Sequence, residues 1–132
     1  MDEPDPPAIE FLISHPVLPS LDLDQTVTFY EAKLGFARTL LSDEVAVLKR
    51  DRIELHFWKC NDANIPANSS CRIQVTGIET LRNHCQSMGI TAGEMQGSEH
   101  YRVFPINDLD GNLIWFFELH GPPPWERQTA AS

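Results

Sequence analysis

The chain has 132 residues, of which 42% are hydrophobic and 22% are charged, and its formal net charge is −9. This composition is typical of a single soluble globular domain. The negative charge argues against a nucleic-acid-binding protein, because such proteins carry basic surfaces that neutralise phosphates. No apolar run approaches the roughly 18 residues of a membrane span, and the acidic first residues do not resemble a signal peptide. We therefore expect a cytoplasmic protein with neither a nucleic-acid nor a membrane partner.

Both ends of the chain are rich in proline and polar residues and lack periodicity. This pattern predicts a disordered leader over residues 1–8 and a flexible tail over residues 122–132. Residues 9–121 are then expected to form a single domain.

The cysteines number three and show no CxxC spacing. An odd set without that spacing favours neither a disulfide framework nor a zinc motif. We expect Cys60, Cys71 and Cys85 to be reduced thiols that pack as small apolar side chains.

The first half of the domain begins with an extended segment, residues 13–20, followed by a predicted helix from Asp22 to Leu34. Asp22 or Asp24 can cap the N-terminus of this helix, and Gly35 is suited to its C-terminal end. Three predicted strands follow the helix, at residues 36–42, 44–50 and 52–58.

The second half repeats the same order. A predicted strand precedes a helix from Ile78 to Met88, and Asp110-Gly111 indicates a hairpin turn between the last two strands. Asp108 and Asp110 look like paired carboxylates, but they lie in this turn, where aspartate is favoured for backbone reasons. The strands of this half are predicted at residues 71–77, 90–96, 101–107 and 112–120, and residues 58–71 are expected to be a solvated linker.

The pattern βαβββ therefore occurs twice, in modules spanning about residues 9–60 and 70–121. The helix-ending letters LGF in the first module match MGI in the second. This repeat predicts an α+β fold in which the two modules form curved mixed sheets around a concave groove, with the helices outside.

Four segments of the chain, in this order and spacing, resemble the bleomycin-resistance proteins: PVLPSLDLDQTVTFYEAKLGF, LKRDRIELHFW, SSCRIQVTGIETLRNHCQSMGI and FPINDLDGNLIWFFE. Those proteins belong to the vicinal oxygen chelate superfamily, together with glyoxalase I, extradiol dioxygenases and fosfomycin-resistance enzymes. The resemblance extends from about His15 to His120. It implies a homodimer whose grooves bind small molecules.

The resemblance also implies where metal-using members of the superfamily place their ligands. His15 and Glu54 match two of these positions, whereas the other two are Ser70 and Trp115. A serine hydroxyl is a poor ligand for a divalent ion and an indole is none, while a catalytic site needs about three protein ligands. We therefore expect no metal and no cofactor. If a metal binds, it would use His15 and Glu54, and a shifted set that adds His56 or Cys71 is the alternative.

The groove is expected to be lined by strand residues that alternate faces and by two loops. In bleomycin-resistance proteins the planar bithiazole stacks between aromatic side chains; here one such position is Val45, and His100 or Tyr101 must supply the other. Asp43 and Glu44 are placed to meet a cationic tail. The competing interpretation is that Trp58 and Trp115 are core residues covered by the dimer partner. The predicted ligand-binding residues are Asp43, Glu44, Val45, Glu54, His56, Trp58, His100, Tyr101, Leu113, Trp115 and Phe117.

The function that this pattern favours is metal-independent binding of a cationic, partly aromatic small molecule, namely sequestration of a bleomycin-type antibiotic that confers resistance. We expect no catalytic residues. One alternative is a metal-dependent lyase, transferase or dioxygenase with altered ligands, and another is a binding module for a different planar metabolite. The valine at position 45 leaves open whether bleomycin itself is the ligand.

Overall fold

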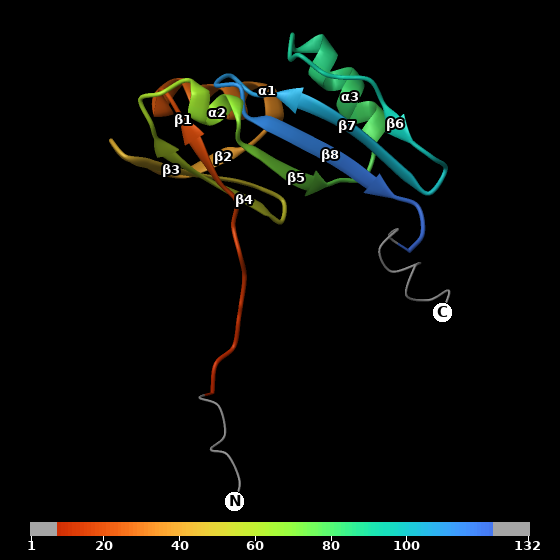
Figure 1. Ribbon diagram of the computed structural model, residues 1–132, viewed down its shortest axis with the longest axis horizontal. Helices are drawn as coiled ribbons and strands as arrows, with labels where there is room; N and C mark the ends of the chain where they lie inside the picture. The colour runs from red at the N-terminus through yellow and green to blue at the C-terminus, as the bar shows by residue number, and fades with distance from the viewer. Residues whose placement is uncertain (1–7, 123–132) are drawn as a thin grey trace, which may run out of the picture.

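The computed structural model describes residues 8–122, which form two four-stranded mixed sheets, one from each half of the chain (Figure 1). The N-terminal sheet has the strand order β1-β4-β3-β2 and the C-terminal sheet the order β5-β8-β7-β6. The parallel pairs are β1 with β4 and β5 with β8, and the other pairings are antiparallel. The strands are β1 (Val17–Ser20), β2 (Ala37–Leu41), β3 (Val45–Arg50), β4 (Ile53–Lys59), β5 (Ser70–Gln74), β6 (Gln96–Gly97), β7 (Tyr101–Asn107) and β8 (Leu113–Leu119). The predicted α+β fold class is confirmed.

The two main helices begin and end close to the predicted residues. Helix α1 (Leu23–Leu34) is capped by the Asp22 side chain, which accepts a hydrogen bond from the backbone N–H of Gln25 at 3.0 Å. It ends at Gly35, whose φ of 71° lies in the left-handed region that glycine adopts without strain. Helix α3 (Ile78–Ser87) occupies the equivalent place in the second half.

The core lies between the helices and one face of each sheet. Helix α1 packs on β2, β3 and β4, and α3 packs on β7 and β8. On β4, Leu55 and Phe57 are buried against α1, and on β8, Ile114 and Phe116 are buried in the same way. Because side chains alternate along a strand, their neighbours point to the opposite face. No helix of the described segment is long and apolar enough to cross a membrane.

One sequence prediction is wrong and another is incomplete. Residues 90–96 form no regular strand: only an isolated bridge at Ala92 and the two-residue β6 pair with β7. The cause is Pro105 on β7, which has no N–H to donate to a ladder; Gly93 donates to its carbonyl at 2.8 Å, and a side chain at Gly93 would collide with the proline ring. Residues 58–71 are not simply a linker, because they contain the end of β4, the short helix α2 (Asn64–Ala67) and the start of β5.

The turn between β7 and β8 carries a buried carboxylate, Asp108. Its Oδ1 accepts hydrogen bonds from three backbone N–H groups of the turn, and its Oδ2 accepts from the Tyr30 hydroxyl at 2.8 Å and the Asn112 amide at 2.9 Å. Burial raises the pKa of Asp108, although the hydrogen bonds from Asn112 and Tyr30 act in the opposite direction. Burial likewise raises the pKa of Tyr30, so its hydroxyl remains a donor.

The same turn also binds the start of helix α1. Asp110 accepts hydrogen bonds from the Thr26 hydroxyl at 2.6 Å and from the backbone N–H of Leu21 at 3.0 Å. The two aspartates therefore have structural partners, and they connect the second half of the chain to the first.

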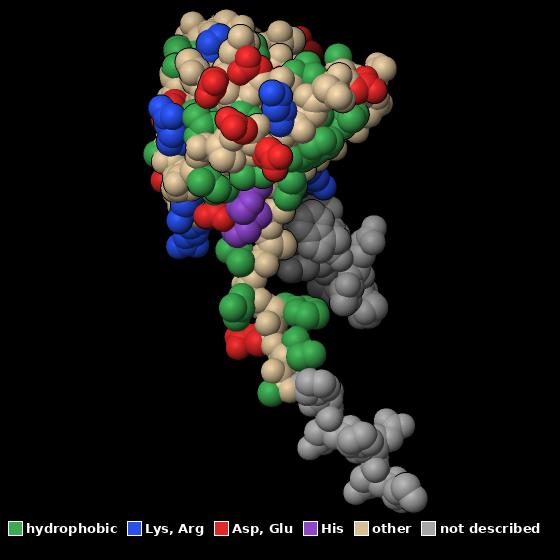
Figure 2. Space-filling view, turned by 90° about the vertical axis from the view of Figure 1, so that its left-hand side faces the viewer, with side chains coloured by type: hydrophobic (Ala, Val, Ile, Leu, Met, Phe, Trp, Pro, Cys, Tyr) green, Lys and Arg blue, Asp and Glu red, His purple; other side chains and the backbone are tan. Residues whose placement is uncertain are grey.

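The predicted leader and tail lie almost wholly outside the described residues. Residues 8–14, which we call the N-terminal arm, run in an extended path away from the sheets, on the side opposite the helices (Figure 1). Apolar side chains project from the arm along its length (Figure 2). Their exposed fractions range from 70% to 96%, at Ile9, Phe11, Leu12 and Ile13.

Candidate ligand-binding groove

The helix-free face of the N-terminal sheet carries three of the predicted residues, Glu54, His56 and Trp58 on β4. They alternate with the buried Leu55 and Phe57, as the strand period requires. The register of β3 against β4 places Val45 directly opposite Trp58. Trp58 is 39% exposed and Val45 is 41% exposed, so within the described chain this tryptophan is not a core residue.

Four predicted residues line one open hollow of about 570 Å³: Asp43, Glu44, Val45 and Trp58. The remaining lining residues are Lys59, Cys60, Asn61 and Ile65. The hollow therefore combines one indole and apolar side chains with two acids and a single lysine. An aromatic surface next to negative charge suits a ligand that is both planar and cationic.

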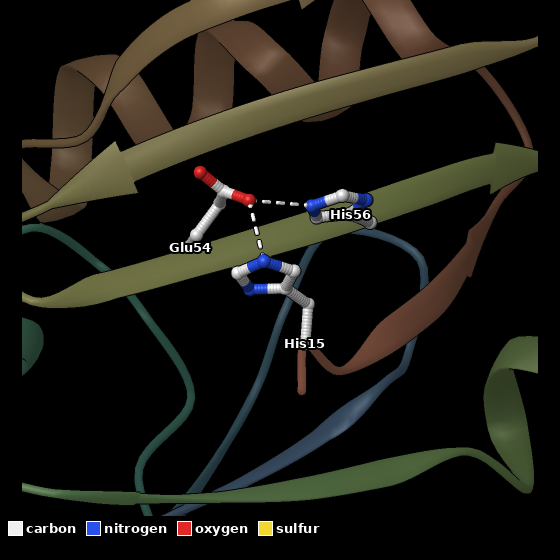
Figure 3. A group of neighbouring side chains, drawn as sticks. All are labelled: His15, Glu54 and His56. Atoms are coloured by element: carbon white, nitrogen blue, oxygen red, sulfur yellow. Dashed lines mark hydrogen bonds and ion pairs between the residues drawn. The ribbon is translucent and has the colours of Figure 1, made fainter. Parts of the chain in front are cut away.

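A cluster of His15, Glu54 and His56 lies further along the same face (Figure 3). The Nε2 atoms of His15 and His56 lie 2.9 Å and 2.8 Å from the same Glu54 oxygen, Oε2. The two imidazole rings stack, with centroids 4.6 Å apart and an interplanar angle of 14°. The parallel pairing of β1 with β4 brings His15 to this position, since the carbonyl of Pro16 accepts from the backbone N–H of His56 at 3.1 Å.

The cluster is partly open to solvent. The exposed side-chain fractions of His15, Glu54 and His56 are 25%, 24% and 33%. The hydrogen bond from His56 is the main cause of a lowered pKa at Glu54, and the charges of His15, His56 and Lys49 add to it, while partial burial acts in the opposite direction. Glu54 is therefore an ionised carboxylate at neutral pH.

The corresponding face of the C-terminal sheet carries Leu113, Trp115 and Phe117 on β8. All three are half-buried, whereas Ile114 and Phe116 between them are buried in the core. The predicted alternation along this strand therefore agrees with the structure.

Arg72 on β5 also belongs to this face, although the sequence analysis did not single it out. The parallel register places it beside Trp115. Its guanidinium lies 4.7 Å from the centroid of the Phe117 ring and donates to the Tyr101 hydroxyl at 2.7 Å. The alternation of side chains in SCRIQ places Arg72 on the face opposite the buried Ile73. Together with the parallel pairing of β5 and β8, this alternation could have predicted that Arg72 lies on the same face as Trp115.

The structure does not bring all the predicted residues into one hollow. Tyr101 packs near Phe117, with ring centroids 6.2 Å apart, but His100 lies in the loop before β7 and contacts Glu99 and the carbonyl of His120. The hollow of the N-terminal sheet contains four of the eleven predicted residues. The other seven lie outside its lining: Glu54 and His56 further along β4, and His100, Tyr101, Leu113, Trp115 and Phe117 in the C-terminal half.

Comparison with known proteins gives a consistent result. The bleomycin resistance protein of Geobacillus stearothermophilus is 32% identical over 127 residues, a match that spans 81% of this chain and 96% of the relative. The crystal structure of the bleomycin-binding protein from Streptomyces verticillus complexed with copper(II)-bleomycin superimposes with a TM-score of 0.74 at 24% identity, over 86% of this chain and 99% of the other. A glyoxalase-related enzyme from Clostridium phytofermentans gives a TM-score of 0.71 at 17% identity, over 87% of this chain and 100% of the other.

No protein-family model matches the chain. The sequence match nevertheless covers nearly the whole of the curated relative, and the two solved structures have the same fold. The chain belongs to the bleomycin resistance proteins of the vicinal oxygen chelate superfamily.

Proposed function

We propose that this protein binds and sequesters a bleomycin-type antibiotic on the helix-free faces of its two sheets and thereby confers resistance. Membership of the bleomycin resistance family supports this function. The observation that carries it is the half-buried indole of Trp115, which stands on the groove face where metal-using relatives are expected to have a carboxylate ligand. An indole in that place stacks on planar rings instead of coordinating an ion.

The two sheets offer different chemistry to such a ligand. The C-terminal sheet presents aromatic surface, at Trp115, Phe117 and Tyr101, and is suited to planar rings. The hollow on the N-terminal sheet presents Trp58 beside Asp43 and Glu44 and is suited to a positively charged tail. A ligand that combines rings with a cationic tail matches both surfaces.

The test of this function is a titration with metal-free bleomycin in the presence of a chelator, followed by tryptophan fluorescence. We expect a saturable change in emission, because Trp58 and Trp115 lie on the surfaces that contact the drug. Expression in a sensitive bacterium should raise the inhibitory concentration of the drug. Absence of saturable binding would contradict the proposal.

The active form in this proposal is a homodimer, and the N-terminal arm supports it. The register of β1 on β4 pairs Val17 with His56, and its continuation would place Ser14 level with Ile53, where β4 begins. The arm therefore extends past β4, which in the described part of the chain is the only strand that lies beside β1. Its exposed apolar side chains gain burial by contact with a second copy.

Light scattering tests this assembly. The solution mass is expected to be about twice the 15.0 kDa of one chain. Replacing Phe11 and Ile13 with aspartate should shift the equilibrium toward the monomer, because two charges would then have to be buried. A monomer of the unaltered protein at micromolar concentration would contradict the dimer.

We also place the protein in the cytoplasm. Its three cysteines are free. Burial raises the pKa of Cys71 and Cys85 to about 11, so both are protonated, unreactive thiols at neutral pH. Free thiols of this kind are compatible with a reducing compartment.

A further inference from the structure

We propose that His15, Glu54 and His56 together bind one divalent transition-metal ion, in a site that lies entirely in the N-terminal half of the chain. This site lies on the same face as the N-terminal part of the proposed antibiotic groove, but antibiotic binding as proposed needs no ion. The argument begins with the positions of the three donor atoms.

The three side chains turn toward a common point, as Figure 3 shows, and each offers one ligand atom. The two Nε2 atoms and the carboxylate oxygen all lie within 4.8 Å of one another. Zinc–nitrogen and zinc–oxygen bonds are about 2.0–2.2 Å long, so two ligands of one ion lie at most about 4.4 Å apart. The donors are therefore close to the separations that a bound ion requires, and small side-chain movements suffice.

The donor set indicates which ions fit. Two imidazoles and one carboxylate favour zinc, iron(II), nickel or copper(II) over magnesium and calcium, which prefer all-oxygen sites. Three protein ligands leave open positions for water. Because each side chain is between 24% and 33% exposed, the ion and its water ligands can reach the cluster from solvent.

The fold holds the three residues of the cluster close together. Pairing of β1 with β4 fixes the two backbones, and the imidazole rings are stacked. In the ion-free protein both Nε2 atoms must donate a proton to one carboxylate oxygen; in the metal-bound form each imidazole carries its proton on Nδ1 and Nε2 becomes a ligand. The positive charge of Lys49 opposes binding of a metal ion. Lys49 lies opposite Glu54 in the register of β3 and β4.

The family resemblance implies ligands from both halves of the chain, and the sequence analysis gave the set with His56 only as an alternative. Two of those positions are Ser70 and Trp115, which cannot hold an ion. The third ligand here is His56, two residues after Glu54 on the same face of one strand. Of the two added ligands that the sequence analysis considered, the structure favours His56, because it shows His56 in contact with the other two residues.

The experiment uses the full-length chain without a purification tag, stripped of metal by dialysis against a chelator. Zinc is titrated by calorimetry, and cobalt(II) is titrated by visible absorption, which reports nitrogen and oxygen ligands directly. We expect one ion per chain, a cobalt spectrum with visible ligand-field bands, and a rise in melting temperature at saturating zinc.

Three single variants, His15→Ala, Glu54→Gln and His56→Ala, should each lower zinc affinity by at least tenfold. The matched control is His84→Ala, since His84 is an exposed histidine on α3 whose Nε2 contacts the Lys33 carbonyl; this variant should titrate like the unaltered protein. Circular dichroism verifies that each variant is folded. A histidine variant that does not fold is replaced by His15→Gln or His56→Gln, and Glu54→Gln is replaced by Glu54→Ala.

Absence of ion binding in the unaltered protein overturns the proposal, and so does binding that all three variants retain. Titration with metal-free bleomycin on the same samples keeps the two ideas apart. Zinc binding without drug binding would support the metal site and contradict the antibiotic function. Drug binding without zinc binding would support the antibiotic function and contradict the metal site.

Discussion

The burial of Trp115 shows on which face of β8 its side chain lies. Its neighbours Ile114 and Phe116 are 1% and 5% exposed and belong to the core, whereas Trp115 lies half-buried on the opposite face of β8. A core tryptophan would be covered by helix α3, but this one lies beside Arg72 on the groove face. Its indole is therefore partly exposed in the described part of the chain.

The first prediction concerns this indole. Trp115→Ala should weaken binding of bleomycin roughly threefold to tenfold through lost stacking alone, because aromatic stacking adds about 0.5–1.5 kcal/mol beyond buried area. Trp115→Phe should retain much of the affinity. Both constants are measured by fluorescence of the remaining tryptophans, together with the melting temperature of each variant.

The opposite result has a distinct signature. If Trp115 were a core residue, its replacement by alanine would cost about 3–5 kcal/mol of stability, and the folded fraction would bind bleomycin with unchanged affinity. A destabilised protein with normal affinity would therefore exclude stacking on this residue.

The second prediction concerns the carboxyl group of Asp108. Burial raises its pKa in the folded protein, so its contribution to the free energy of unfolding is fully present below about pH 3.9, the unfolded value, and is lost as pH rises through the folded pKa. Tyr30→Phe removes a donor that lowers this pKa. It should therefore raise the pKa further and cost about 1–2 kcal/mol of stability.

Carbon-detected NMR titration of the Asp108 carboxyl measures the pKa, and urea denaturation measures the free energy of unfolding. An Asp108 that titrates at or below the value of an unfolded chain would contradict the dominant effect of burial. A Tyr30→Phe variant with an unchanged pKa would exclude the hydrogen bond.

At the level of elements, the turn between β7 and β8 joins the two halves of the chain. Asp110 in this turn accepts from Thr26 in α1 and from Leu21 just before it. The turn residues that the sequence analysis assigned to backbone geometry therefore also make long-range contacts, and their carboxylates are already occupied by these partners.

The third prediction follows from these two hydrogen bonds. Asp110→Ala should lower the free energy of unfolding by about 1–3 kcal/mol, since it leaves the Thr26 hydroxyl and the Leu21 N–H without this acceptor. Asp43→Ala, at an exposed loop position, is the matched control and should change stability by less than about 0.5 kcal/mol. Equal effects of the two substitutions in chemical denaturation would show that the contact with α1 contributes nothing.

At the scale of the whole molecule, the net charge of −9 favours cationic ligands. The distribution of charge over the groove is uneven. Asp43 and Glu44 line the hollow on the N-terminal sheet with Lys59, while the aromatic face of the C-terminal sheet carries Arg72. In the proposed binding mode, a cationic tail would therefore lie on the N-terminal sheet and the planar rings on the C-terminal sheet.

The fourth prediction is that affinity for bleomycin falls as salt concentration rises. The acids of the hollow are exposed, and the Debye length is only about 8 Å at physiological ionic strength. The double variant Asp43→Asn, Glu44→Gln should bind more weakly at low salt and show a flatter salt dependence. Titrations at two ionic strengths measure this, and an affinity independent of salt would mean that the charge has no part in recognition.

Local patterns in the chain were enough to predict the fold class, both long helices and the face of each central strand. Caps such as Asp22 and Gly35 act within one helical turn, and the alternation in RIELHFW and NLIWFFELH repeats every two residues, so short segments carry this information. The missing strand at residues 90–96 depended on a partner, since Pro105 interrupts the ladder from a neighbouring strand.

Contacts between distant residues were decided only by the tertiary structure. The pairing of β1 with β4 brings His15 to Glu54 and His56, and the pairing of β5 with β8 brings Arg72 onto Phe117; each contact joins residues roughly forty positions apart. Strand order and register determine such distances, and neither is encoded by the local periodicity of one segment. The chain alone therefore indicated which side chains share one face of a strand, while the fold determined which of them lie in contact.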